Sequence, residues 1–328
     1  MFVVTGGAGF IGSNLAAALE ARAPGRVVVC DALGSGDKWR NIAKRELNAL
    51  VAPQELAAFL DAHAAEVKTI FHLGAISSTT EKNVDLLVAN NIDFSLGLWD
   101  WCARRNVPFI HASSAATYGA GENGFDDDPS SAALARLRPL NPYGWSKHVV
   151  DRRIAHAVES GAPKPPQWAA LKFFNVYGPN EYHKDGMRSV VAQVYPRAAE
   201  GASARLFKSH NPAYEDGGQL RDFVWVGDCV DVMLWLHANP AVSGLFNLGT
   251  GKARSFADLA GAVYRALNRI PAIEYVETPP HLRAQYQYFT QAPMARLRAA
   301  GYAKPFTELE DGVARYVREH LAADDPYV

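Results

Sequence analysis

The stretch VVTGGAGFIGSNL, residues 3–15, places a glycine-rich turn between a short apolar run and a pattern typical of a helix. Gly6, Gly9 and Gly12 follow G-x-x-G-x-x-G spacing. Glycines allow a tight turn, let backbone N–H groups approach a pyrophosphate and bring the helix close to the strand. This strand-turn-helix context predicts the phosphate-binding turn of a dinucleotide-binding domain.

An acidic residue follows at the spacing expected for contact with the adenosine ribose. Asp31 ends the next β-rich run, about 20 residues after Gly9. A carboxylate there favours NAD, because it repels the 2′-phosphate of NADP. Lys38 or Arg40, in the run GSGDKWR, could neutralise that phosphate. The residues themselves therefore leave both NAD and NADP open.

The first half of the chain alternates β-rich runs with longer helical patterns. The β-rich runs are residues 2–4, 27–30, 69–75, 108–114 and 168–174. The helical patterns are residues 13–21, 53–62, 84–103 and 143–158. Strands that alternate with helices form a parallel sheet covered on both faces. We therefore expect an α/β fold with a Rossmann-type, doubly wound parallel sheet.

After residue 174 the pattern changes to more loops and shorter elements. Helical patterns at 190–200 and 229–238 flank the apolar run RDFVWVGD, residues 221–228, and GLFNLGTG follows at 244–251. We expect residues 1–173 plus about 220–255 to form the nucleotide-binding domain. Residues from about 174 to 219 plus 256–328 would form a smaller, mixed α/β substrate-binding domain.

Composition excludes several classes of partner. The 328 residues, 48% of them hydrophobic, can bury a large core. The 33 basic and 34 acidic residues nearly cancel and form no basic block, which argues against a nucleic-acid partner. No apolar run approaches membrane-spanning length, and the N-terminal residues lack the features of a signal peptide. Three widely spaced cysteines fit reduced thiols in the cytoplasm, and no metal site is expected because no ligand-spaced His/Cys cluster occurs.

A second motif carries acid/base chemistry. In NPYGWSK, residues 141–147, Tyr143 and Lys147 stand four residues apart and so share one helix face. A phenol has an ordinary pKa of about 10, and a nearby ammonium and an oxidised nicotinamide would both favour its phenolate. The strand end HASSAATYG supplies the hydroxyls of Ser113, Ser114 and Thr117, one of which could hold a substrate oxygen while the phenol exchanges a proton.

These motifs, in this order, resemble the extended short-chain dehydrogenases/reductases of the nucleotide-sugar epimerase type, along nearly the whole chain. The widely shared segments are VTGGAGFIGSN, NPYGWSK and RDFVWVGD. Three features are more specific to the heptose epimerases of that family: GAISSTTE at 74–81, the His-Lys pair that follows NVYGPNE, and FTQA at 289–292.

The resemblance implies a reaction and a mechanism. Such enzymes oxidise C6 of ADP-heptose with tightly held NADP and return the hydride to the opposite face of a transient ketone, which supplies heptose for the lipopolysaccharide core. Tyr143 matches the acid/base for one epimer, Ser114 lies beside it, and Lys147 holds the cofactor ribose. Lys184 matches the acid/base for the other epimer and also contacts the cofactor. The family further implies a homo-oligomer, with a pentamer as one form.

Other contacts carry over by position. The expected cofactor contacts, besides the three glycines, Lys147 and Lys184, are Phe10, Ile11, Asp31, Ala32, Lys38, Leu73, Gly74, Ala75, Ile76, Ser77, Asn90 and Val176. The expected substrate contacts are Asn175, Gly186, Gln193, Phe207, Lys208, Ser209, His210, Arg221 and Tyr286. Arg221 suits a diphosphate because its guanidinium is a planar fork of donors.

The sequence also departs from the family pattern. Gly186 stands in place of a serine that contacts substrate, and Gln193 replaces a histidine, so these two contacts stay open. Pro53 occupies the position of a lysine that contacts the cofactor, which weakens the expectation of NADP. Residues 121–140 and 208–223 form longer loops than usual, and they could reshape the rim of the pocket or an oligomer contact.

Alternatives remain for Lys184 and for the whole chain. Lys184 could instead pair with the substrate diphosphate, or stay solvated among its charged neighbours; acid/base work requires its pKa to fall from about 10.4. An epimerase for a UDP- or dTDP-hexose would use the same catalytic residues. A dehydratase is disfavoured because Ala115 and Ala116 stand where an Asp-Glu pair is needed. A non-catalytic NAD(P)-binding protein would tolerate loss of Tyr143 or Lys147, and both are present.

Overall fold

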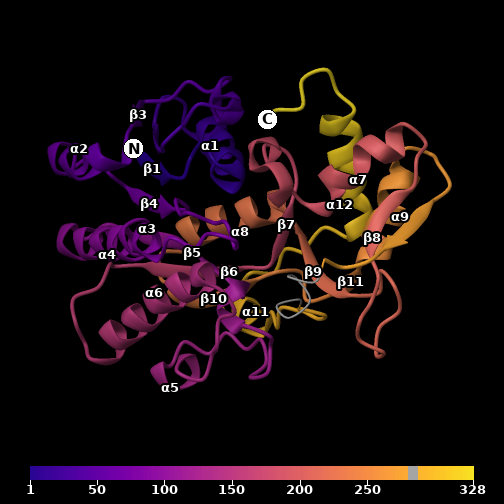
Figure 1. The fold of residues 1–328 in the computed structure, drawn as a ribbon. Helices are drawn as coiled ribbons and strands as arrows, with labels where there is room; N and C mark the ends of the chain where they lie inside the picture. The colour runs from indigo at the N-terminus through magenta and orange to yellow at the C-terminus, as the bar shows by residue number, and fades with distance from the viewer. Residues whose placement is uncertain (280–286) are drawn as a thin grey trace.

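A parallel sheet forms the larger part of the molecule. The computed structural model describes residues 1–279 and 287–328, and within them seven strands pair in the order β10-β6-β5-β4-β1-β2-β3, all in parallel (Figure 1). The strands are β1 (Phe2–Thr5), β2 (Val27–Cys30), β3 (Ala49–Val51), β4 (Thr69–His72), β5 (Phe109–Ser114), β6 (Trp168–Phe173) and β10 (Gly244–Leu248). The predicted doubly wound α/β fold is confirmed.

Helices cover both faces of this sheet. Successive residues of each strand point to opposite faces, so the apolar strands have two apolar faces to bury. Val4 and Val29 pack in a core with α1 (Phe10–Arg22) and α8 (Val226–Ala238). Val3 and Val28 pack in a second core with the helices of the other face. Those helices are α2 (Leu56–Ala62), α4 (Phe94–Arg105) and α6 (Pro142–Glu159), with α5 (Ser131–Leu134) against α6.

Several short helical segments complete the larger part. The predicted helix at 84–103 consists of α3 (Val84–Leu87), a π-helical turn at Val88–Asp93, and α4. The 3-10 turns are Asp37–Ile42, Pro53–Glu55, Ala115–Tyr118 and Tyr182–Met187. Among the described residues, no helix combines the length and the apolar character needed to cross a membrane.

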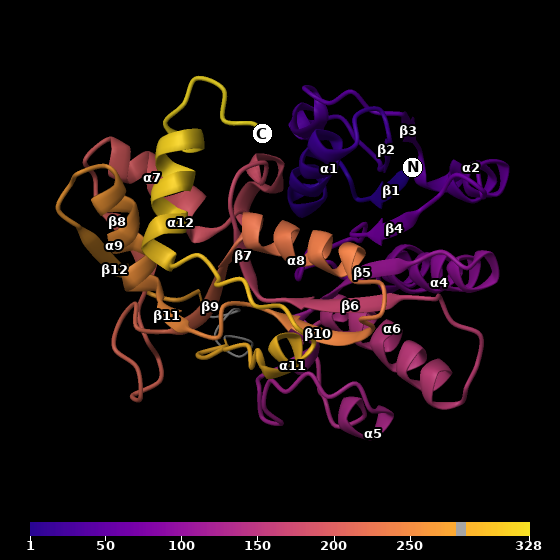
Figure 2. The ribbon, with the colours of Figure 1, turned by 180° about the vertical axis from the view of Figure 1, so that it is seen from behind.

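A smaller unit lies beside the carboxyl ends of the large sheet (Figure 2). In the described residues it contains the three-stranded sheet β11-β9-β7 and the pair β12-β8. Its strands are β7 (Asn175–Tyr177), β8 (Ala204–Phe207), β9 (Leu220–Trp225), β11 (Ala253–Ser255) and β12 (Ile273–Val276). Its helices are α7 (Val190–Ala199), α9 (Phe256–Ala266), α12 (Leu309–Arg315) and a π-helical turn at Tyr316–Leu321; α11 (Ala295–Ala299) packs on β10.

Strand pairing bears on the predicted division of the chain. The prediction assigned residues from about 220 to 255 to the larger domain. In the structure β10 pairs in the large sheet and α8 packs against it, whereas β9 pairs with both β7 and β11 in the smaller unit. The exact limits of the two domains stay a prediction, but the chain passes between the two units more than once.

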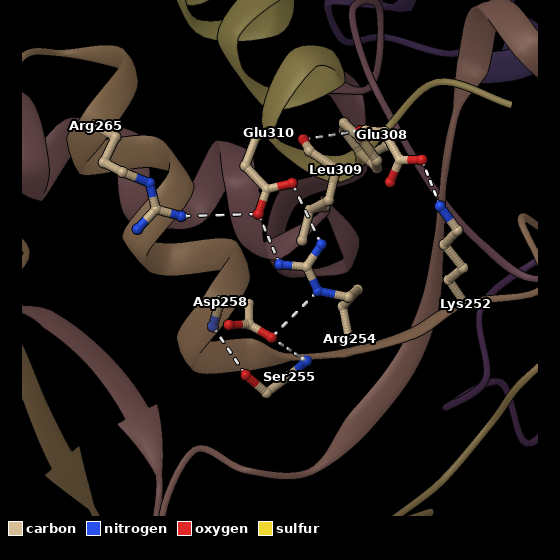
Figure 3. Close-up of polar contacts among 9 residues, drawn as sticks. Lys252, Arg254, Ser255, Asp258, Arg265, Glu308, Leu309 and Glu310 are labelled. Atoms are coloured by element: carbon tan, nitrogen blue, oxygen red, sulfur yellow. Dashed lines mark hydrogen bonds and ion pairs between the residues drawn. The ribbon is translucent and has the colours of Figure 1, made fainter.

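Ion pairs hold the C-terminal helix of the smaller unit in place (Figure 3). The Arg254 guanidinium on β11 contacts Glu310 at 2.6 Å and Asp258 at 3.3 Å, and Lys252 pairs with Glu308. These groups are partly exposed, so each pair contributes at most about 1 kcal/mol. The network therefore orients α12 more than it stabilises the fold.

A buried carboxylate joins three separate segments near the boundary of the two units. Asp222, on β9, accepts hydrogen bonds from the backbone N–H groups of Thr250, Gly251 and Ala292 at 2.7 to 3.0 Å, and from the Thr250 hydroxyl at 2.7 Å. Burial raises the pKa of Asp222, and these donors lower it again in part. The side chain thus satisfies donors that would otherwise be buried without a partner.

Replacing Asp222 with Ala should destabilise the protein by about 3 kcal/mol or more, because several buried N–H donors lose their acceptor together. Asp222→Asn is the matched control, since its amide keeps one oxygen acceptor and should cost less. Urea unfolding followed by circular dichroism measures both. Equal losses for the two variants would contradict this role of the carboxylate.

Candidate active site

A cleft of about 930 Å³ opens between the carboxyl ends of the large sheet and the smaller unit. Residues from the first glycine turn, the ends of β4, β5 and β6, the N-terminal part of α6, and the 3-10 turn Tyr182–Met187 line it. Ligands of doubly wound sheets bind at this edge, where adjacent crossovers diverge. The predicted site residues that line it are Gly6, Gly9, Phe10, Ile11, Gly12, Asp31, Lys38, Leu73, Gly74, Ala75, Ser77, Ser114, Tyr143, Lys147, Asn175, Val176, Lys184, Gly186 and Arg221.

The glycine turn at the floor of this cleft has no room for side chains. Gly6 has a φ of +65°, and a Cβ atom there would meet the Gly74 backbone nitrogen at 2.6 Å. A Cβ atom on Gly12 would lie 2.1 Å from the Gly6 carbonyl oxygen. Gly9 caps α1 without a side-chain hydrogen bond, so first-turn N–H groups of α1 can bind a pyrophosphate. The turn fits the dinucleotide predicted from the sequence.

The predicted ribose-binding residues form a tight cluster. Asp31 accepts a hydrogen bond from the Ala8 N–H at 2.9 Å with one oxygen, and its other oxygen pairs with the Lys38 ammonium at 2.5 Å. Lys38 also donates to the Ala32 carbonyl at 3.1 Å. The negative charge of Asp31 is therefore balanced by a cation on the cleft wall.

The predicted catalytic residues of α6 and β5 meet in the cleft. Asn141 caps α6 by accepting from the Gly144 N–H at 2.8 Å, so Tyr143 and Lys147 fall on successive turns of one face. A hydrogen bond joins the side chains of Tyr143 and Ser114. The Lys147 ammonium donates to the Ala112 carbonyl at 2.9 Å, and burial lowers its pKa to about 8.

Taken together, the protein groups around Tyr143 do not lower the pKa of its phenol, which differs from the expectation from the sequence. We expected Lys147 to lower the pKa of the Tyr143 phenol. Burial instead raises that pKa, the hydrogen bond with Ser114 lowers it in part, and the charge of Asp151 raises it further. Lys147 is turned toward a backbone carbonyl, so its effect on the phenol does not outweigh the loss of water around the ring.

Lys184 lies on another wall of the same cleft, on the 3-10 turn Tyr182–Met187. Its ammonium lies 5.5 Å from the centre of the Phe10 ring. Burial lowers its pKa, while Glu181 raises it. The Glu181 carboxylate itself accepts hydrogen bonds from Ser189 and Tyr316. Among the described ion pairs none involves Lys184, and the direction of its shift is the one that acid/base work requires.

Some predicted contacts lie elsewhere. Asn90 is exposed and donates to the Leu86 carbonyl at 2.8 Å. The next residue, Asn91, is buried and exchanges hydrogen bonds with the Ile76 backbone and donates to Ser146 at 3.0 Å. It thereby ties the loop after β4 to α6, a function that the sequence pattern did not reveal.

The remaining predicted contacts do not line the cleft. Gln193 donates to the Arg188 carbonyl at 2.7 Å, and Lys208 pairs at 3.0 Å with Glu277, the residue directly after β12. Tyr286 lies outside the described residues. The predicted contacts found away from the lining are Ala32, Ile76, Asn90, Gln193, Phe207, Lys208, Ser209 and His210.

Sequence reasoning missed a buried charged pair behind the predicted catalytic residues, Asp151 on α6 and Lys172 on β6. Two signals could have revealed it. Asp151 stands four residues after Lys147 and so lies on the same helix face. Lys172 lies inside the apolar run WAALKFF, where a charge needs a partner.

The fold and this cleft are those of a nicotinamide-dependent enzyme that acts on a sugar nucleotide, and comparison with known proteins agrees. The model of the NAD dependent epimerase/dehydratase family matches residues 2–249, and the chain belongs to that family. Curated ADP-L-glycero-D-manno-heptose-6-epimerases are similar over their full length: the one from Nitratidesulfovibrio vulgaris (strain DP4) is 48% identical, with 100% of both chains covered. The one from Fusobacterium nucleatum is 43% identical, again with 100% of both chains covered.

A solved structure gives the same result for the fold. The crystal structure of Helicobacter pylori ADP-L-glycero-D-manno-heptose-6-epimerase superposes with a TM-score of 0.79 at 28% identity. The match covers 98% of this chain and 96% of that one. The likeness therefore extends over both the large sheet and the smaller unit.

Proposed function

We propose that this chain interconverts ADP-D-glycero-β-D-manno-heptose and ADP-L-glycero-β-D-manno-heptose by inverting C6, a step that supplies heptose for the lipopolysaccharide core. The chain is an epimerase, and thus an isomerase, by its family and its relatives. The observation that carries the proposal is the placement of two separate acid/base groups, Tyr143 and Lys184, on one cleft beside a dinucleotide-binding turn.

Two such groups suit the inversion of C6, because each epimer then has its own proton acceptor. The glycine turn would hold a nicotinamide dinucleotide, which would supply the hydride acceptor and donor for oxidation of C6 and reduction of the ketone on its other face. Tyr143 takes the hydroxyl proton of one epimer, while Ser114 holds the same oxygen by a hydrogen bond. Lys184 exchanges the proton of the other epimer. A neutral amine is the proton acceptor, so the lowered pKa of Lys184 favours this function.

Cationic and polar groups of the cleft wall would hold the ADP moiety. Arg221 lines the cleft, and its guanidinium already donates to the backbone carbonyls of Leu220 and Gln287. These bonds orient the fork of donors that a diphosphate requires. We propose that Arg221 binds the diphosphate and that Asn175 contacts the heptose.

For the cofactor, we propose NADP. The family's description supports a nicotinamide dinucleotide, and the cluster at Asp31 supports the phosphorylated form. An unpaired carboxylate would repel a 2′-phosphate, but Asp31 is neutralised by Lys38 at 2.5 Å. The ammonium of Lys38 can then serve the phosphate as a charge-assisted donor.

Removal of the Lys38 cation should affect the binding of NADPH and the binding of NADH to different extents. Lys38→Ala is expected to weaken NADPH binding about tenfold or more and to change NADH binding little, because only NADPH carries the phosphate. Fluorescence titration of cofactor-free protein with both nucleotides measures this. Arg40→Ala is the matched control, since Arg40 stacks on the Tyr327 ring at 4.7 Å. An equal loss of NADPH and NADH affinity in Lys38→Ala would contradict the assignment.

The function itself is tested by incubation of the protein with ADP-D-glycero-β-D-manno-heptose and by NMR observation of the configuration at C6. Conversion to the L-glycero epimer supports the proposal. Failure to convert this substrate, together with conversion of a UDP- or dTDP-hexose, would replace it with the related hexose epimerase. Light scattering on the same sample tests the homo-oligomer that the resemblance implies.

A further inference from the structure

A buried ion pair lies directly behind the catalytic residues. The Asp151 carboxylate and the Lys172 ammonium are 2.6 Å apart, and their side chains are 1% and 0% exposed. A buried charge without a partner costs several kcal/mol, whereas a pair needs good geometry and further hydrogen bonds to break even. The hydrogen-bond partners of Asp151 and Lys172 therefore indicate which segments of the chain the pair fixes in position.

Those partners are the residues that surround Ser114. The Ser113 hydroxyl donates to the same Asp151 oxygen at 2.7 Å. The Lys172 ammonium donates to the Thr117 hydroxyl at 2.5 Å and lies 4.8 Å from the centre of the Tyr118 ring. The pair thus anchors the end of β5 on one side of Ser114 and the following 3-10 turn on the other.

The same carboxylate acts on the active-site lysine. Asp151 lies one helical turn beyond Lys147 on α6, and its charge favours the ammonium form that burial disfavours. The titratable groups that face Lys147 from the other packed strands are His72 on β4 and His111 on β5, and burial lowers the pKa of both, that of His111 to about 4. Both histidines are therefore neutral near pH 7, and Lys172 on β6 is already paired.

We infer that Asp151 and Lys172 are positioning residues of the epimerase: the pair fixes the strand end that presents Ser114, and the Asp151 carboxylate keeps Lys147 charged. The inference rests on the proposed function for its catalytic part. The charged form of Lys147 donates the stronger hydrogen bonds to a cofactor ribose, and its positive charge favours the phenolate form of Tyr143.

Two single variants separate the electrostatic effect from a merely structural one. Asp151→Asn keeps the shape and can still accept from Ser113, but it removes the charge that favours protonated Lys147. The alkaline limb of the pH profile of kcat/KM should move to lower pH by about one pH unit. The pH above which cofactor affinity falls should move down by the same amount. Lys172→Met removes the same ion pair but leaves the carboxylate, so neither limb should move down.

Lys172→Met should instead lower kcat roughly tenfold at every pH, because Ser114 loses part of its support. A merely structural role predicts that both variants lose activity with unchanged pH limits. That result, or a downward shift in both variants, would overturn the inference. Cofactor affinity is measured by fluorescence titration and does not depend on the sugar substrate.

The double variant Asp151→Asn/Lys172→Met covers the case in which a single variant fails to fold, since it leaves neither member of the pair as an unpaired buried charge. Its pH limits should also move down, and wild-type limits there would overturn the inference. The wild type is assayed in parallel. Its failure to convert ADP-heptose would overturn the proposed function, whereas an unshifted cofactor-affinity limit in Asp151→Asn would overturn the role of Asp151.

Discussion

Replacing Tyr143 with Phe should lower the interconversion of the two ADP-heptose epimers by about 1,000-fold, the range expected for loss of an acid/base group. The ring would still fill its site on α6, and Ser114 would lose only one hydrogen bond. The cofactor should stay bound, because Lys147 and the glycine turn are unchanged. NMR of C6 after long incubation measures the residual rate.

The two half-reactions, in each of which one epimer reduces the bound cofactor, test the function of Tyr143 more specifically. If Tyr143 serves one epimer, its loss should block reduction of bound cofactor by that epimer and spare reduction by the other, which absorbance at 340 nm reports. Tyr264→Phe is the matched control, because Tyr264 donates its hydroxyl proton to the Ala202 carbonyl in the smaller unit, away from the cleft. Retention of more than about a tenth of wild-type turnover in Tyr143→Phe would remove the phenol from the mechanism.

Lys184→Met should give the complementary defect. Interconversion is expected to fall about 1,000-fold with the cofactor still bound, because the second epimer loses its acid/base. The epimer served by Tyr143 should still reduce the cofactor, and the other should not. The pattern of half-reactions in the two variants is therefore opposite, which a general loss of structure would not produce.

The same experiment weighs the other interpretations of Lys184. If Lys184 only binds the diphosphate, Lys184→Met should raise KM and leave both half-reactions intact. If the side chain is merely solvated, turnover should be close to that of the wild type. Lys252→Met serves as control, because Lys252 is an exposed lysine that pairs with Glu308 outside this cleft (Figure 3). Either of the first two outcomes would contradict acid/base catalysis by Lys184.

The pH dependence of Lys184 follows from the direction of its shift. Burial lowers its pKa, so its neutral form is populated at a lower pH than for a solvated lysine. The half-reaction that uses Lys184 as a base, in which its epimer reduces the bound cofactor, should thus gain rate as the pH rises to that pKa, and absorbance at 340 nm measures it.

The parallel sheet could be predicted from local patterns, and particular elements show why. Each of β2, β4, β5 and β6 lies within a predicted β-rich run, and β1 extends one residue beyond its run, because continuous apolar runs mark strands buried on both faces. β3 escaped prediction, since three residues at a sheet edge form too short a pattern. The π-helical turn at Val88–Asp93 was not predicted; it contains Asn91, whose side chain donates hydrogen bonds to Ile76 and Ser146, far away in the sequence.

The sequence by itself determined the glycine turn and the shared helix face of Tyr143 and Lys147, since both follow from the chemistry of neighbouring residues. Burial and pairing between distant segments were decided by the folded chain. The pairing of Asp151 with Lys172, the upward shift of the Tyr143 pKa and the downward shift of the Lys184 pKa depend on which segments exclude water around each group. No local pattern carries that information, because residues far apart in the sequence build each environment.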